Sequence, residues 1–214
     1  MPTYNNYNLV DKNIIPDDCE IFNCYHSSLT ELPELPNGLI ELFCSYNILT
    51  ELPELPNGLK LLCCYHNKII ELPLLPDGLI DLYCRANNLT ELPKIPNGLQ
   101  ELSCCYNKIT KLPELSNGIV KLDCSDNKII ELPELPDELK HLDCSQNNLT
   151  ELPKLPDGLK VLYCDNNPIK YITPENYKIM IRNYLENRYS ICVYDTIFYD
   201  NKGCSSLGEF FGLE

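Results

Sequence analysis

The chain lacks three features that would each indicate a class of protein. It has no run of about eighteen apolar residues, so no membrane span is expected. Its first residues, MPTYNNYNLVDKNIIPDD, contain no basic segment followed by an apolar core, so we expect no secretory signal and a cytoplasmic protein. Basic residues are few: 17 Lys and Arg stand against 31 Asp and Glu, a net charge of −14. This balance argues against binding to nucleic acid or to an anionic membrane.

What the chain has instead is a repeat of twenty residues. LIELFCSYNILTELPELPNG (39–58) is followed by LKLLCCYHNKIIELPLLPDG (59–78) and LIDLYCRANNLTELPKIPNG (79–98). A cysteine marks eight successive units without an insertion, at Cys24, Cys44, Cys64, Cys84, Cys104, Cys124, Cys144 and Cys164. A fixed short period is the signature of a solenoid. We therefore predict eight repeats over 19–169, an N-terminal cap over 1–18 and a C-terminal cap over 170–214.

The first half of each unit alternates apolar and variable residues, which predicts a strand with one buried face. In residues 39–47 the expected inward set is Leu39, Leu42 and Cys44, and the expected outward set is Glu41, Phe43 and Ser45. An asparagine closes each strand, at Asn47, Asn67, Asn87, Asn107, Asn127, Asn147 and Asn167. Turned inward, its amide can bond the loop carbonyls and amides of adjacent turns, so that a continuous ladder satisfies each member.

The second half of each unit, LTELPELPNG, cannot form a helix. Two prolines three residues apart remove backbone donors and favour an extended, polyproline-II-like segment. The Asn-Gly or Asp-Gly pair that follows predicts a tight turn, because glycine tolerates a positive φ. One site of this segment carries a glutamate in most units, which we expect to be solvated: Glu31, Glu51, Glu71, Glu91, Glu131 and Glu151. An ordinary reason for the acidic charge is therefore that these side chains keep the array soluble.

The pattern of the thirteen cysteines does not indicate a disulfide framework. Their number is odd, and eight of them recur at the inward site of successive turns. Neighbouring parallel strands would hold these Cβ atoms about 4.8 Å apart, whereas a disulfide needs about 3.8 Å. We predict a ladder of free thiols that act as small hydrophobic side chains in a reducing compartment. Metal binding and oxidation stay open as alternatives.

The motif LxxLxCxxN, with cysteine at the third apolar site, resembles the LxxLxLxxNxL hallmark of leucine-rich repeat proteins. The LPxLP return resembles the short-repeat subclass of secreted bacterial effectors and of giant DNA viruses of amoebae, and the Asn-, Ile-, Lys- and Tyr-rich flanks favour the viral group. The resemblance implies an α/β-class solenoid, mostly β. It would be a right-handed coil with a parallel sheet on its concave side and polyproline-II segments and turns on its convex side. It also implies that a partner protein binds the concave side.

The two ends of the chain break the period. Leu9, Val10, Ile14 and Ile15 are expected to cover the first open edge of the coil. Near the other end, Thr173 is a helix N-cap residue and Pro174 suits the first helical position, so we predict a helix over about 174–188. Its expected apolar stripe is Tyr177, Ile181, Tyr184 and Leu185. A strand over 190–200 should follow, with Cys192 and Cys204 as ordinary members of this cap.

Two groups of outward side chains form the candidate binding surface. The first five units carry aromatic residues at Tyr25, Phe43, Tyr46, Tyr65, His66, Tyr83 and Tyr106. The last three carry acids at Asp123, Asp126, Asp143 and Asp165. Exposed rings are typical of binding hot spots, although aromatic residues on adjacent strands can also simply stabilise a sheet. We predict that a protein partner places an apolar element on the aromatic residues and a basic element on the acidic ones.

Other functions have less support in the sequence. His141, Asp143, Ser125 and Ser145 can be drawn as a nucleophilic site, but an open sheet neither excludes water nor supplies an oxyanion hole. Cys19, Cys24 and His26 would give a metal ion only three ligands. We therefore predict a protein-binding module that is not an enzyme and has no cofactor or metal, favoured as a monomer, in the host cytoplasm if it is viral. The alternative is a structural component that associates with its own copies.

Overall fold

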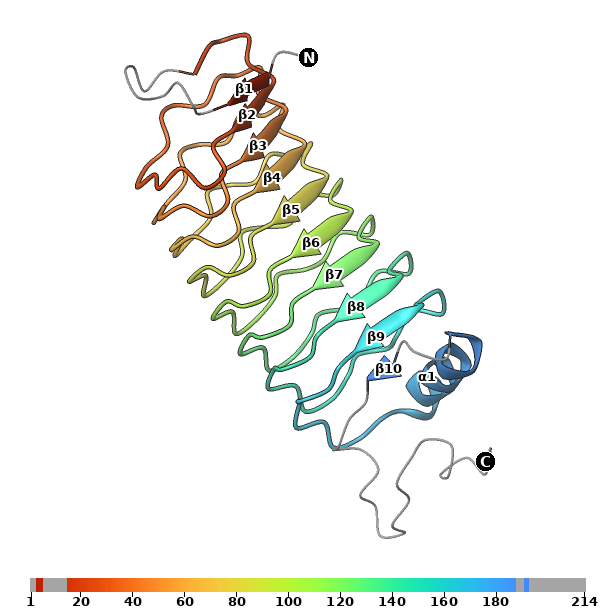
Figure 1. Cartoon of the computed structure of the whole chain (residues 1–214). Helices are drawn as coiled ribbons and strands as arrows, with labels where there is room; N and C mark the ends of the chain where they lie inside the picture. Colours follow the sequence, from red (N-terminus) through yellow and green to blue (C-terminus); the bar gives the residue numbers. More distant parts are fainter. Residues whose placement is uncertain (1–2, 6–14, 188–190, 193–214) are drawn as a thin grey trace.

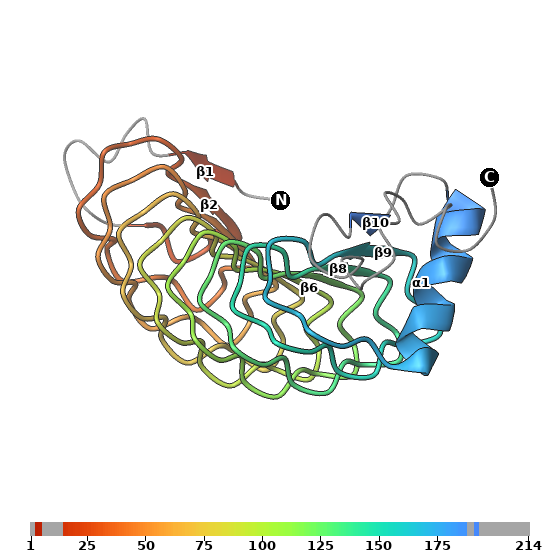
Figure 2. The same ribbon diagram turned by 90° about the horizontal axis from the view of Figure 1, so that it is seen from below.

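The computed structural model describes residues 3–5, 15–187 and 191–192. In this part the chain winds into a curved coil, and one parallel sheet lines the concave side (Figures 1 and 2). The strands are β1 (Thr3–Asn5), β2 (Ile21–Asn23), β3 (Glu41–Phe43), β4 (Leu61–Cys63), β5 (Asp81–Tyr83), β6 (Glu101–Ser103), β7 (Lys121–Asp123), β8 (His141–Asp143), β9 (Val161–Tyr163) and β10 (Ile191–Cys192). Their order in the sheet is their order in the chain.

The register of β2 to β9 follows the period of the sequence. Leu42 pairs with Leu62, and Leu62 pairs with Leu82, so each strand lies beside the residues twenty positions later. The predicted solenoid with a parallel concave sheet is therefore confirmed.

The interior of the coil consists of stacked leucine, isoleucine and cysteine side chains. Leu39, Leu42 and Cys44 are fully buried, as predicted. The eleven cysteines whose side chains the structure describes are all buried, and the predicted ladder of thiols is formed by Cys24, Cys44, Cys64, Cys84, Cys104, Cys124 and Cys144. Burial raises the pKa of Cys84 well above its ordinary value, and the neighbouring Cys64 adds to the shift. A protonated, buried thiol is an inert hydrophobic group, so this ladder is structural.

The asparagines form the predicted second ladder. The Nδ2 group of Asn87 donates to the carbonyl oxygens of Cys64 and Cys84, both at 3.0 Å, and its Oδ1 accepts from the N–H of Ile69 at 3.0 Å. The same three kinds of bond recur at Asn47, Asn67, Asn107, Asn127, Asn147 and Asn167. Each amide thus joins consecutive turns and satisfies backbone groups that would otherwise be buried without partners.

The strands are shorter than the sequence indicated. We predicted a strand that runs to Asn47, but β3 ends at Phe43. The reason lies at Tyr46, whose φ of 56° is left-handed and turns the chain out of the sheet. Because the alternation of faces stops with the strand, Ser45 was also predicted wrongly: only 1% of it is exposed.

The return segments between strands form neither helix nor strand at their prolines, as expected. The predicted turn is present, since the N–H of Leu59 donates to the carbonyl oxygen of Pro56 at 3.0 Å. The predicted reason for glycine was wrong, however, because none of the six glycines in the described part of the chain has a φ between +20° and +160°. A Cβ on Gly118 would lie 3.3 Å from the carbonyl oxygen of Asn97 in the preceding turn, so close stacking favours glycine there. The glutamates of these segments are exposed, as predicted.

The helix α1 (Pro174–Asn187) covers the C-terminal end of the coil (Figure 2). Thr173 caps it, since its Oγ1 accepts from the N–H of Asn176 at 3.2 Å. The predicted apolar stripe did not include the most buried described residues of the helix, which are Asn176, Ile179 and Met180. Tyr177 and Ile181 are only partly buried. The burial of Asn176 has a structural reason: its amide bonds the carbonyl oxygen of Pro153 and the N–H of Leu155, both at 2.8 Å.

Several predictions for the caps lie outside the described residues. These concern Leu9, Val10, Ile14, the side chains of Tyr184, Leu185 and Cys192, most of the strand predicted over 190–200, and Cys204. Ile15 is described and buried, in agreement with a cap at this end.

Candidate functional site

The predicted binding residues occupy three rows along the concave side. The first row is the last residue of each strand and contains Phe43, Tyr83, Asp123 and Asp143, all partly buried. The second row lies two residues later, beyond the strand, and contains Tyr25, Tyr65 and Asp165. The third row follows directly and contains Tyr46, His66, Tyr106 and Asp126.

The third row is set by the backbone rather than by the residue type. Its φ angles lie between 51° and 56° at Tyr46, His66, Tyr106 and Asp126. A left-handed conformation is uncommon for a residue other than glycine. It recurs here at the same place in every unit because the chain must leave the sheet there, so it carries no sign of a special site.

Five of the rings at the N-terminal end contact one another, and we call them the aromatic cluster: Tyr25, His26, Tyr46, Tyr65 and His66. The ring of Tyr46 stacks on His66 with centroids 4.4 Å apart, and it meets Tyr25 and Tyr65 edge-on at 5.2 and 5.5 Å. Arg85 lies over Tyr65, 4.8 Å from the ring centroid. Half of Tyr25 and 38% of Tyr46 are still exposed. The cluster is therefore both internally packed and open to a partner.

The structure divides the predicted aromatic group. His26 joins the cluster, although the sequence did not single it out for binding. Phe43 lies partly buried on β3, and Tyr106 is 59% exposed beside the carboxylate of Asp126, which raises the pKa of the Tyr106 hydroxyl. Tyr83 belongs to a different part of the concave side.

That part is a hollow of about 470 Å³ over β5 to β9. Its lining includes Tyr83, Glu101, Lys121, Asp123, Asp143 and Tyr163. Tyrosines thus stand on its first and last strands, and charged side chains lie between them.

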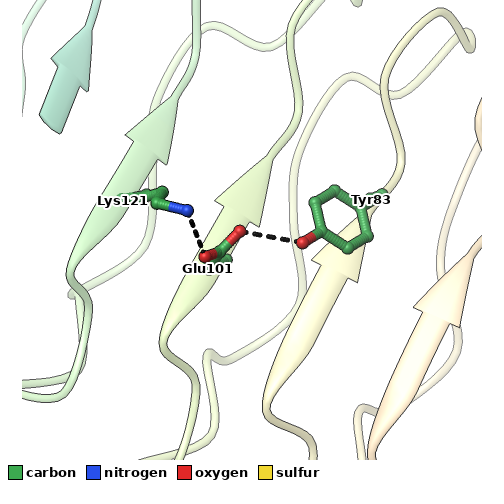
Figure 3. Close-up of polar contacts among 3 residues, drawn as sticks. All are labelled: Tyr83, Glu101 and Lys121. Carbon is green, nitrogen blue, oxygen red and sulfur yellow. Dashed lines mark hydrogen bonds and ion pairs between the residues drawn. The ribbon is translucent and has the colours of Figure 1, made fainter.

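A chain of polar contacts crosses three of these strands (Figure 3). The hydroxyl of Tyr83 donates to Oε2 of Glu101 at 2.8 Å, and Nζ of Lys121 donates to Oε1 at 2.5 Å. The bond from Lys121 lowers the pKa of the Glu101 carboxyl. Burial, followed by the bond to Glu101, raises the pKa of Tyr83. Glu101 therefore stays ionised and is neutralised by a cation of its own chain.

Asp123 and Asp143 are neighbours in the register of β7 and β8. Each carboxylate accepts two bonds at Oδ1 from the serine two residues later. Ser125 reaches Asp123 at 2.8 Å through its hydroxyl and at 3.2 Å through its N–H, and Ser145 reaches Asp143 at 2.6 and 3.0 Å. Burial nevertheless raises the pKa of Asp143, and Asp123 and Asp165 add to the effect. In the described part of the chain no basic side chain forms an ion pair with either carboxylate.

Sequence reasoning missed Glu101, Lys121 and the position of His141 in the hollow. All three are the first residue of their strand, three positions before the ladder cysteine. We predicted that Glu41, the equivalent residue of an earlier unit, faces outward, but we did not include this row in the candidate binding surface. The row shares a face with the residue just before the cysteine, because strand residues two apart share a face.

Other chemistries find little support in the described residues. There, no group of three or more His, Cys, Asp or Glu side chains is arranged to hold a metal ion. None of the helical segments that the structure describes is long and apolar enough to cross a bilayer.

Comparison with known proteins gives consistent results. A family model described as Leucine Rich Repeat matches residues 138–159. A comparison with curated proteins gives no match. Among solved structures, YopM from Yersinia enterocolitica WA-314 is 38% identical with a TM-score of 0.71, over 75% of this chain and 36% of that chain. YopM of Yersinia pestis, described as a leucine-rich effector protein, is 28% identical with a TM-score of 0.66, over 75% and 53% of the two chains.

A third structure is matched over most of its length. The leucine-rich repeat domain of a Shigella effector is 31% identical with a TM-score of 0.63, over 78% of this chain and 77% of that chain. By contrast, the chain spans about a third to a half of the two YopM chains.

Proposed function

Because the chain belongs to the leucine-rich repeat family, we propose that it is a non-enzymatic protein-interaction module that binds a partner protein on the concave side of its sheet. Proteins with this fold are typically interaction modules. The observation that carries the proposal is the contrast along the concave side. Exposed rings at one end are followed at the other by carboxylates that form no ion pair with a basic side chain of the described residues.

The aromatic cluster supports an apolar contact. Tyrosine provides a large contact area at a low cost in conformational entropy, and tyrosines are enriched among the residues that dominate binding energy. In the cluster the rings already hold one another, so little further ordering is needed when a partner docks. We propose that an apolar element of the partner lies here.

The acidic end supports a basic contact. Asp123, Asp126, Asp143 and Asp165 lie near one another in consecutive turns, and two of them raise the pKa of Asp143. A negative patch attracts a basic partner surface and increases its association rate. The net charge of −14 favours a protein with a basic surface over nucleic acid as the partner.

The geometry at His141 supports the non-enzymatic part of the proposal. A nucleophilic serine needs its hydroxyl held by a general base such as histidine. The hydroxyl of Ser145 instead donates to Asp143 at 2.6 Å, and that of Ser125 donates to Asp123 at 2.8 Å. These serines position carboxylates.

We further propose that the partner belongs to a host cell. Two of the similar structures are described as effectors, one from Yersinia pestis and one from Shigella. The free thiols of the interior fit a reducing compartment such as a host cytoplasm. The viral source that the composition of the flanks favours stays a prediction.

Affinity capture from host-cell lysate followed by mass spectrometry would identify the partner. Replacing Tyr65 and Tyr83 by serine should then weaken its binding by about tenfold or more, as expected when rings of a binding centre are lost. Tyr171→Ser is the matched control, because this tyrosine is 63% exposed and lies outside the concave rows. Equal affinity of both variants for the captured protein would refute the proposal. Light scattering of the purified chain would separate it from self-association, for which a concentration-dependent oligomer is expected.

A further inference from the structure

The hollow over β5 to β9 is lined by charged side chains of both signs, and some of them already have a partner within the chain. Glu101 is held by Lys121 at 2.5 Å, and Arg85 lies 4.8 Å from the ring centroid of Tyr65. Asp123 and Asp143 differ from these groups. Their hydrogen bonds come from neutral groups: serine hydroxyls, backbone N–H groups and, at Asp123, the thiol of Cys105.

The two carboxylates are held in equivalent positions. Each belongs to an Asp-Cys-Ser triplet, at 123–125 and at 143–145, and each uses Oδ1 for its serine. Ser125 and Ser145 are themselves more than nine-tenths buried, so they fix the side chains that they bond. Since β7 and β8 are adjacent parallel strands, the two aspartates lie about 4.8 Å apart along the sheet.

We propose that this hollow binds the side chain of an arginine from the partner protein, with the guanidinium group between Asp123 and Asp143. The inference rests on the proposed function and specifies the chemistry of the partner at this point. Tyr83 and Tyr163 line the same hollow, so aromatic rings lie near the proposed position of the guanidinium group.

Arginine fits this site better than lysine for two reasons. A guanidinium group has five donors in a planar fork, so it can reach two neighbouring carboxylates at once, whereas an ammonium group acts as a compact point charge. The guanidinium plane also stacks on aromatic rings. A volume of about 470 Å³ leaves room for the side chain together with part of the backbone that carries it.

Three tripeptides test the proposal directly on the full chain. They are N-acetyl-Gly-X-Gly-amide with X as arginine, lysine or citrulline, where citrulline keeps the shape of arginine without its charge. Titration at low ionic strength, followed by NMR of the backbone amides, should give saturable shifts around Tyr83, Asp143 and Tyr163 with the arginine peptide. We expect about tenfold weaker binding of the citrulline peptide, the usual loss for a hydrogen bond to a charged group, and intermediate binding of the lysine peptide.

Asp143→Asn should also lower the affinity for the arginine peptide by about tenfold, because it removes the charge. The variant keeps an oxygen that can accept the hydrogen bond from Ser145. Glu91→Gln is the control: it makes the same change of charge at an exposed site of a return segment. Equal affinity for the arginine and citrulline peptides, or for the arginine and lysine peptides, would overturn the proposal. A loss of affinity for the arginine peptide that is as large in Glu91→Gln as in Asp143→Asn would also overturn the proposal.

These results are separable from the proposed function. If a captured partner no longer binds the Tyr65→Ser variant but binds Asp143→Asn with unchanged affinity, the proposed function is supported and the arginine site is refuted. If the arginine peptide binds the hollow and no captured protein responds to any concave substitution, the proposed function fails instead.

Discussion

Two triplets at the same place in the repeat show how the ends of the concave side differ. In Phe43-Cys44-Ser45 the serine hydroxyl is buried and has no hydrogen-bond partner among the described residues. In Asp143-Cys144-Ser145 the equivalent hydroxyl donates to the aspartate at 2.6 Å. The cysteine between them is buried in both cases.

The comparison shows that one set of residues determines the interior of the coil and a different set determines its concave surface. Leucine, cysteine and asparagine fix the backbone of every turn, whichever residues stand outside. The outward residues are then free to differ, and they do: rings gather beside β2 to β5, and carboxylates gather beside β7 to β9. Substitutions in the ladder should therefore act alike at both ends, and substitutions on the surface should not.

The largest effect is expected for the asparagine ladder. Asn87→Ala and Asn147→Ala each remove four side-chain hydrogen bonds and leave buried backbone groups without partners. Each should lower the free energy of unfolding by about 3 kcal/mol. Urea unfolding followed by circular dichroism would measure both losses.

Asn148→Ala is the matched control for the ladder, since Asn148 is the exposed neighbour of Asn147 and only its backbone bonds the preceding turn. It should change the free energy of unfolding by less than about 0.5 kcal/mol. A large difference between the losses at Asn87 and Asn147 would contradict the view that the interior is uniform.

A second effect should separate the two ends. Tyr46→Ala removes one stacked and three edge-on ring contacts and should cost about 1–2 kcal/mol of stability. Tyr106→Ala changes the same position of a later repeat, where φ is 53° and the ring contacts no other ring in the described part of the chain. We expect less than about 0.5 kcal/mol there. Equal thermal midpoints for the two variants would show that the aromatic cluster does not stabilise the fold.

The serines should respond with opposite signs. Ser145→Ala removes the hydroxyl that bonds Asp143 and should cost about 1 kcal/mol. Ser45→Ala removes a buried hydroxyl that lacks a partner, so it should leave stability unchanged or raise it by up to about 1 kcal/mol. Differential scanning calorimetry of both variants would test this, and a clear loss for Ser45→Ala would mean that its hydroxyl is satisfied.

These differences also show which features of the fold could be predicted from the sequence and which could not. The inward positions could be predicted because the period fixes the register, and a buried face allows only apolar side chains such as Leu42. The end of each strand could not, because residues as unlike as Tyr46, Ala86 and Asp126 all take the left-handed φ there. Burial of Ser45 and the bonds from Ser145 to Asp143 both follow from that early end.

The candidate site was predicted in part for a related reason. Residue types showed the aromatic and acidic groups, but contacts between turns decide which members act together. Tyr83 is not part of the aromatic cluster, because its hydroxyl donates a hydrogen bond to Glu101 in the next turn, and Lys121 neutralises that carboxylate. Such pairings depend on side-chain length and conformation, which a pattern of residue types does not contain.

The smallest effect compares the two kinds of carboxylate as the pH changes. The pKa of Glu101 is lowered, mainly by Lys121, so its ionised form stabilises the fold above the ordinary glutamate pKa, and this contribution is lost as the pH falls through the lowered value. The pKa of Asp143 is raised, mainly by burial, so its ionised form costs stability at neutral pH, and the cost is relieved as the pH falls through the raised value. At pH 7 Glu101→Gln should therefore be less stable than the natural chain, and Asp143→Asn slightly more stable.

Both differences should stay below about 1 kcal/mol, because the groups are partly exposed and water screens them. Both should shrink on acidification: that of Asp143→Asn first, just above the ordinary aspartate pKa, and that of Glu101→Gln only below the ordinary glutamate pKa. Urea unfolding of the natural chain and the two variants between about pH 3 and pH 7 would show which of the two stability differences shrinks first. If Asp143→Asn proved less stable than the natural chain at pH 7, Asp143 would already be satisfied as an anion. A carboxylate satisfied in this way has little to gain from a partner's arginine, so the sign of this small difference bears directly on what the hollow can bind.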